Sequence, residues 1–168
     1  MQLKKLASLS LFTALALIIF ALESLIPSMI PIPGVKLGLA NIITLVLLRN
    51  YTAKETLLVL LMRIFLSGFF YGQAISLLYS LCGGLFCYII MYLLNRLFNG
   101  HYIFITSMAG GLFHNLGQLA IAFVVTGTMG IMALLPFLII SGILTGLFTG
   151  LCAHFAQVYL IPVIKYYS

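Results

Sequence analysis

The chain has 168 residues, of which 64% are hydrophobic and only 6% charged, with a mean hydropathy of +1.26 and a net charge of +6. It contains no aspartate or tryptophan, and its two carboxylate side chains are Glu23 and Glu55. Because a water-soluble domain carries about 25% charged residues, this composition excludes a soluble fold and predicts an all-α integral membrane protein. The length fits a single transmembrane domain over residues 1–168.

Six apolar segments follow one another along the chain and predict a bundle of six transmembrane helices. They cover about residues 6–26, 37–48, 55–70, 74–94, 103–125 and 131–164. The first segment follows Lys4 and Lys5 but has no small-residue cleavage site before Pro27, so we expect a retained helix rather than a signal peptide. Pro136 and Pro162 are expected to kink or end the last segment.

The second segment is too short to cross a bilayer alone. Its roughly 12 residues span about 18 Å as a helix, whereas the hydrocarbon core is ~30 Å thick. The loop before it, PSMIPIPGVK, has three prolines in seven residues, which disfavour helix. We therefore expect this loop to be tucked into protein, or the segment to be partly re-entrant.

The basic residues predict the orientation. With the N-terminus inside the cell, the residues at cytoplasmic ends are Lys4, Lys5, Arg49, Lys54, Arg96 and Lys165. Lys36 alone falls in an external loop, and Arg63 lies within the membrane. This asymmetry predicts a multi-pass protein of the cell (plasma) membrane with both termini in the cytoplasm. Since the charges sit at the ends of apolar runs, they do not indicate a nucleic-acid partner.

Arg63 is the sharpest functional signal, because it lies about nine residues into the third segment. Estimates for placing an arginine at the bilayer centre run from about 3 kcal/mol to above 10 kcal/mol. One interpretation is an ion pair with Glu23 that fixes two helices together. The other is an anchor for an anionic ligand head group, and the two can coexist. Snorkelling to the interface is a third option.

Further polar side chains are expected in the external half of the bundle. The fifth segment carries GGLFHNLGQ, whose polar residues are spaced to share one helical face. Such side chains need partners inside protein, either as hydrogen bonds between helices or as a ligand-binding face. The predicted substrate-binding residues are Glu23, Lys36, Asn41, Arg63, Gln73, His114, Asn115 and Gln118.

Small residues at helical spacing predict close helix packing or docking of a partner. They are Gly142, Gly146 and Gly150 in the last segment, and Ala7, Ser10, Ala14 and Ala21 in the first. The glycines form a double GxxxG pattern, which lets another helix approach closely. For the first segment, internal packing is the commoner explanation, and seating of a partner helix is the alternative.

The run IPIPGVKLGLANIITL, together with GQAISLLYSLCGG and GGLFHNLGQL, resembles the Gx transporter family, also described as heptaprenyl diphosphate synthase component I. The likeness covers nearly the full length. The plan is also similar to the S components of energy-coupling-factor transporters, which bind a micronutrient in an external site. That second resemblance implies a partner, a transmembrane coupling subunit with two ATPases. It also implies docking through a small-xxx-small motif, to which Ser10 and Ala14 correspond approximately.

The residues argue against catalysis by this chain. The synthase resemblance implies Mg²⁺ held by aspartate-rich motifs, since Mg²⁺ prefers oxygen ligands, but the chain has no aspartate. It also lacks Walker A and HExxH sequences. Its cysteines, Cys82, Cys87 and Cys152, have neither metal-ligand nor disulfide spacing. We therefore expect no enzyme activity, no cofactor and no metal site.

Two main hypotheses for the function follow. The first is a substrate-binding membrane protein of the S-component type, with a small anionic or polar molecule as its ligand. The alternative is a non-catalytic membrane subunit associated with polyprenyl (heptaprenyl) diphosphate or quinone biosynthesis, with a prenyl synthase as its partner. A third reading is a purely structural membrane partner in a redox or transport complex. In each case the lipid bilayer surrounds the protein.

Overall fold

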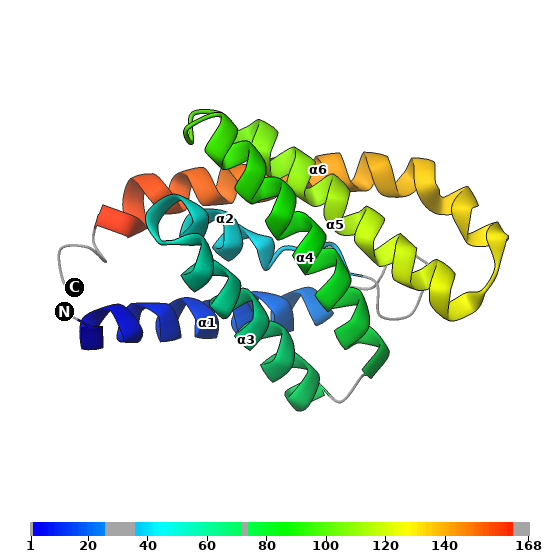
Figure 1. Ribbon diagram of the computed structural model, residues 1–168, viewed down its shortest axis with the longest axis horizontal. Helices are drawn as coiled ribbons and strands as arrows, with labels where there is room; N and C mark the ends of the chain where they lie inside the picture. Colours follow the sequence, from blue (N-terminus) through cyan, green and yellow to red (C-terminus); the bar gives the residue numbers. More distant parts are fainter. Residues whose placement is uncertain (1, 26–35, 72–73, 163–168) are drawn as a thin grey trace.

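The computed structural model describes residues 2–25, 36–71 and 74–162 (Figure 1). This part of the chain is helical and contains no β-strand. The helices are α1 (Gln2–Leu25), α2 (Asn41–Asn50), α3 (Ala53–Tyr71), α4 (Ala74–Leu97), α5 (Ile103–Thr126) and α6 (Leu135–Phe155), with a 3₁₀ segment η1 (Met129–Leu134) before α6 and a π-helical segment η2 (Ala156–Leu160) after it.

Four helical stretches are long and apolar enough to cross a membrane. They are Leu3–Leu25, Ala74–Leu97, Ile103–Thr126 and Met129–Leu160. Helix α3 has 19 residues but carries Lys54, Glu55 and Arg63, and α2 has only 10 residues. The all-helical membrane class is therefore confirmed, while a count of six spanning helices stays a prediction.

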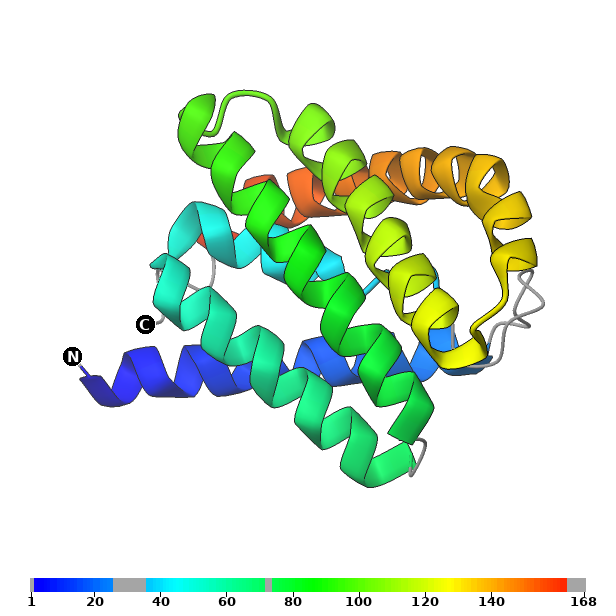
Figure 2. The same ribbon diagram turned by 45° about the vertical axis from the view of Figure 1, so that its right-hand side comes forward.

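The helices surround α2. Helices α4, α5 and α6 pack side by side, α3 crosses α1 obliquely and packs against it, and α2 contacts α1, α3, α4 and α6 (Figures 1 and 2). Most of α2 is buried, including the whole run 43–48. A helix that is apolar on every side belongs inside a protein. The second segment is thus enclosed by protein, and it begins at Asn41 rather than Leu37. Most of the proline-rich loop that was expected to be tucked into protein lies outside the described residues.

Contacts between chain segments define two ends of the bundle. At the first, the Lys5 end, Lys5 of α1 pairs with Glu55 of α3, and Arg49 of α2 contacts Gly100 between α4 and α5. At the other, the Glu23 end, Glu23 of α1 contacts the residues just before α2. Two of the basic residues predicted to share one side, Lys5 and Arg49, thus lie at the Lys5 end, whereas Lys165 lies outside the described residues.

The glycines of α6 pack against α5, as the double GxxxG pattern predicts. A Cβ atom added to Gly142 would lie 2.9 Å from the carbonyl oxygen of Gly111, and one on Gly146 would lie 2.6 Å from Cα of Met108. Gly150 faces Ser107, whose hydroxyl lies 2.8 Å from that of Thr149. Any side chain larger than hydrogen would push the two helices apart.

The small residues of α1 behave differently, and the favoured expectation of internal packing is wrong for three of them. Ala7, Ser10 and Ala14 are exposed on the outer side of α1, and Ala21 is partly buried. The side of α1 that packs inward instead carries three large residues, Leu9, Phe12 and Phe20, together with Ala16. The reason is that bulky side chains fill the space beside α3, so the small ones are left on the opposite face.

The last predicted segment is not one regular helix. Residues Met129–Leu134 form the 3₁₀ segment, Pro136 lies in the first turn of α6, and a π-helical stretch follows Phe155. Proline is tolerated in a first turn because its missing N–H would have no partner there. Pro136 therefore starts α6 instead of kinking it.

Candidate functional site

Arg63 lies inside the protein and does not point into hydrocarbon. It is in the middle of α3, its side chain is only 4% exposed, and its nearest glycine is Gly84 of α4, where an added Cβ would lie 3.8 Å from Nη2. In the described part of the chain, Nη2 of Arg63 has no hydrogen-bond partner. A buried donor atom of an ionised group is costly when it has no partner.

The carboxylate of Glu23 binds backbone rather than Arg63. The N–H of Gly38 donates to Oε1 over 2.6 Å, and the N–H of Leu39 donates to Oε2 over 3.0 Å. Among the described residues the recorded ion pair is Lys5–Glu55, so the direct Glu23–Arg63 ion pair offered as one interpretation is not found. The charge of Arg63 still acts on Glu23 through space.

Gly38 needs to be glycine at this point for two reasons. Its φ angle is +84°, in the left-handed region that disfavours other residues. An added Cβ would also lie 2.7 Å from Cδ2 of His114 and 2.8 Å from Nδ2 of Asn41. The residues just before α2 thus pack between Glu23 on one side and His114 on the other.

Lys36 adds a second positive charge next to Glu23. Its ammonium group donates to Oγ of Ser24 over 2.5 Å and lies 3.3 Å from the centre of the Phe20 ring, a cation–π contact. Partial burial lowers the pKa of Lys36 to about 8, with the charge of Arg63 acting in the same direction and that of Glu23 opposing both. This lysine therefore loses its proton near pH 8 instead of near pH 10.5.

His114 lies between two amide side chains. The amide of Asn41 is 3.2 Å from its Nδ1, and the amide of Gln118 is 3.0 Å from its Nε2. A neutral imidazole offers one donor and one acceptor, so one amide must donate to it and the other must accept through its oxygen. The structure points the nitrogens of both amides at the ring and leaves Oδ1 of Asn41 and Oε1 of Gln118 without a partner among the described residues. Whichever amide turns its oxygen to the ring leaves its NH₂ group free instead.

Two adjacent glycines of α4 bring these groups together. An added Cβ on Gly83 would lie 3.0 Å from Cε1 of His114, and one on Gly84 would approach Arg63. Because neighbouring positions on a helix are about 100° apart, the pair faces α5 with one residue and α3 with the next. Helix α4 therefore lets both side chains reach the same region.

Asn115 does not share this region with His114. Its side-chain amide donates to the backbone oxygen of Leu138 over 2.9 Å and to Oγ of Ser141 over 3.1 Å, both in α6. The shared face expected for the fifth segment is thus divided, with Asn115 joining α5 to α6. Gln73, another predicted site residue, lies outside the described residues.

We call the remaining residues the polar cluster. They are Glu23, Lys36, Asn41, Arg63, His114 and Gln118. They come from α1, α2, α3, α5 and the stretch before α2. The cluster contains two cationic side chains and one carboxylate, with an imidazole and two amides beside them. Such a set can hold an anion and orient a hydrogen-bonding group. No group of three metal-ligating side chains occurs in the described ranges.

Sequence reasoning missed the backbone donors of the cluster. The N–H groups of Gly38 and Leu39 meet Glu23, although no side-chain motif marks them. A signal was present in the run PGVKLGLAN, where a glycine stands one turn before an apolar helix. A glycine in that place is typical of a backbone turn that needs a positive φ.

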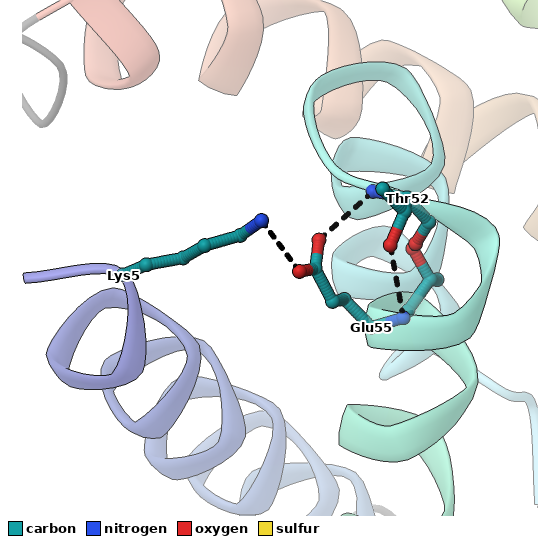
Figure 3. A network of polar contacts seen from close by, with 4 residues as sticks. Lys5, Thr52 and Glu55 are labelled. Atoms are coloured by element: carbon teal, nitrogen blue, oxygen red, sulfur yellow. Dashed lines mark hydrogen bonds and ion pairs between the residues drawn. The ribbon is translucent and has the colours of Figure 1, made fainter. Parts of the chain in front are cut away.

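The Lys5 end carries a contrasting polar group, shown in Figure 3. Nζ of Lys5 lies 2.6 Å from Oε1 of Glu55, and Oε2 of Glu55 accepts the N–H of Thr52 over 3.1 Å. The N–H of Glu55 in turn donates to Oγ1 of Thr52 over 3.4 Å. This reciprocal pattern is a capping box at the start of α3, and it has a structural role.

Comparison with known proteins gives one match. A family model described as heptaprenyl diphosphate synthase component I matches residues 12–156, a range that contains the whole polar cluster. No curated protein and no solved structure matches the chain.

Proposed function

The chain belongs to the heptaprenyl diphosphate synthase component I family, and from this premise we propose that it is a non-catalytic membrane subunit of polyprenyl diphosphate synthesis that holds an anionic head group at the polar cluster. The family name refers to one component of a synthase. Membership agrees with the expectation that this chain is not itself an enzyme, and the lack of aspartate gives the chemical reason.

The observation that carries the ligand part of this proposal is the state of Arg63. A guanidinium that is buried in an apolar bundle, with one nitrogen unpartnered, favours binding of an oxyanion. Lys36 supplies a second positive charge, and Asn41 and Gln118 keep free hydrogen-bonding capacity. A phosphoryl or carboxylate group would accept hydrogen bonds from Arg63 and offset part of this positive charge, whereas a free amide oxygen would bind only a donor group of the ligand.

The surface of the bundle supports a lipid-like ligand. Large apolar side chains are exposed along the helices, among them Phe65, Phe69 and Phe70 of α3. A prenyl chain is as apolar as the lipid around such a surface, so it needs no aqueous path. Only the charged head group of such a ligand needs a polar partner. Within the described bundle, the polar cluster is the set of side chains that combines two cations with buried amides.

Purification in detergent followed by mass spectrometry tests this function. We expect wild-type protein to carry a phosphorylated prenyl lipid or to retain a soluble prenyl synthase, and Arg63→Gln to lose the lipid. Arg96→Gln is the matched control, because Arg96 is exposed in the last turn of α4 and donates to the hydroxyl of Tyr92. Equal ligand occupancy in wild type and Arg63→Gln would contradict the assignment of Arg63.

A second candidate function is substrate binding for transport, as in S components. The observation that favours it is the outward-facing stripe of Ala7, Ser10 and Ala14 on α1, where a coupling subunit would have a close approach. The same purification separates the two functions. A small water-soluble ligand together with a membrane subunit and ATPases supports transport, whereas a prenyl lipid supports the synthase role.

A further inference from the structure

Four groups that bind anions surround the carboxylate of Glu23. Two are the backbone N–H groups of Gly38 and Leu39, which donate to its two oxygens. The other two are the charges of Arg63 and Lys36, which act on it through space. Two N–H donors thus bind the carboxylate of Glu23, and two cations lie near enough to act on its charge.

The backbone part of this arrangement has the geometry of an anion site. The positive φ of Gly38 turns successive N–H groups toward one side, as in the concave backbone turns that bind phosphate and carboxylate. The side-chain part gives an independent observation. Arg63 is 96% buried, yet its Nη2 has no partner in the described part of the chain, and a buried donor left unpaired is costly.

We infer that Glu23 occupies a binding site for an oxyanion, and that the phosphoryl or carboxylate group of the ligand takes its place on the N–H groups of Gly38 and Leu39 and on Arg63. This inference rests on the proposed function and gives the site its mode of recognition.

The competing explanation is that Glu23 only anchors the residues before α2. The two explanations differ in sign for Glu23→Gln. If Glu23 competes with the ligand, loss of its charge strengthens binding, because two like charges near each other at an effective dielectric of about 20 repel strongly. We expect at least about a tenfold tighter dissociation constant. If Glu23 is an anchor that shapes the site, the same change weakens binding or leaves it unaltered.

The test uses purified full-length protein in detergent, with farnesyl diphosphate and inorganic diphosphate as separate probes and calorimetry as the readout. Glu55→Gln is the matched control. It removes the other carboxylate, which also accepts a backbone N–H and meets a lysine, but at the opposite end of α1. We expect Glu23→Gln to bind farnesyl diphosphate at least about tenfold more tightly than wild type, and Glu55→Gln to bind it equally well.

The probes and variants separate the possible failures. Loss of binding in Arg63→Gln tests the proposed function, whereas the sign of the Glu23→Gln effect tests the inference. Binding that is unchanged or weaker in Glu23→Gln overturns the inference and leaves the function intact. Absence of binding in wild type and in every variant overturns both. Equal affinity for the two probes assigns recognition to the oxyanion alone, and preference for farnesyl diphosphate assigns it to a membrane lipid.

A second variant keeps the test decisive if Glu23→Gln does not fold. Glu23→Asp retains the charge but shortens the side chain, so the carboxylate reaches Gly38 and Leu39 less well. A competitor that is held less firmly is displaced more readily, and we expect tighter binding of farnesyl diphosphate than in wild type. Weaker binding would show that Glu23 is an anchor.

Discussion

The two carboxylates of this chain have similar partners in opposite surroundings. Glu55 accepts a backbone N–H from Thr52 and pairs with Lys5 at an end of the bundle where the lysine side chain is 50% exposed. Glu23 accepts two backbone N–H groups and lies near Lys36 and Arg63, but it is only 5% exposed.

The exposure of each carboxylate to solvent decides how much its contacts contribute to the free energy of the protein. An ion pair in water contributes between nothing and about 1 kcal/mol, since solvent and salt screen it. Removing either a buried carboxylate or the hydrogen-bond donors around it is costly, because the group that remains is buried without a partner. The same chemistry is therefore a helix cap at the Lys5 end and a candidate recognition site at the Glu23 end.

The largest effect is expected from crowding the backbone at the Glu23 end. Gly38→Ala combines a positive φ with a Cβ placed 2.7 Å from His114, and we expect a loss of about 3 kcal/mol in stability. Gly127→Ala is the matched control, because Gly127 has a φ of +61° but no atom within 4 Å of an added Cβ. It should lose only about 1 kcal/mol. Thermal unfolding in detergent measures both, and equal losses would show that the contact with His114 is not tight.

The second-largest effect concerns stability in the absence of ligand, compared between variants of the two carboxylates. Glu23→Gln leaves the N–H of Gly38 or Leu39 facing an amide NH₂, so we expect a loss of about 1 to 3 kcal/mol. Glu55→Gln should lose less than about 1 kcal/mol. Unfolding midpoints for the two variants test this order, and a larger loss in Glu55→Gln would reverse the comparison.

A pH dependence sharpens the role of Lys36. Burial lowers its pKa to about 8, so the ammonium is charged below that value and loses its proton as the pH rises through it. We expect the affinity for farnesyl diphosphate to be constant below about pH 7 and to fall by up to about tenfold above about pH 9. Titration calorimetry across this range measures the profile, and Lys36→Gln should remove the step near pH 8.

The smallest effect concerns salt at the Lys5 end. Adding about 1 M salt shortens the screening length to about 3 Å, which should remove the contribution of the Lys5–Glu55 pair. We expect wild type and Lys5→Gln to differ by less than about 1 kcal/mol at low salt and to converge at high salt. A difference that persists in high salt would indicate that the pair is more enclosed than its exposure indicates.

Much of the fold was predictable from where apolar residues begin and end. Helices α4 and α5 begin at the predicted residues, because apolar runs bounded by Asn, Gly and loop residues mark helices well. The boundaries within the last segment were harder to predict, since its composition is equally apolar through η1, α6 and η2. Only backbone geometry separates these three elements. The side of α1 that packs inward was also missed, because small and large residues alternate around it.

The burial of several candidate site residues was predictable from the sequence, whereas their contacts were less so. Burial of Arg63 inside protein follows from the cost of a charge in lipid, and the structure agrees. The partner of Glu23 did not follow, since a backbone N–H is available everywhere in a sequence and leaves no pattern. The separation of Asn115 from His114 reflects the angle of about 100° between neighbouring helix positions. One faces α2 and the other α6.

Composition by itself determined that this chain is a helical membrane protein, because too few charged side chains exist to solvate its surface and lipid leaves only helices or closed barrels as solutions. It also determined that the few buried charges would need partners. Only the tertiary structure decided which partners those are. Pairing depends on how α1, α3 and α5 converge around α2, and that convergence is set by side-chain packing between helices, which no spacing within one helix encodes.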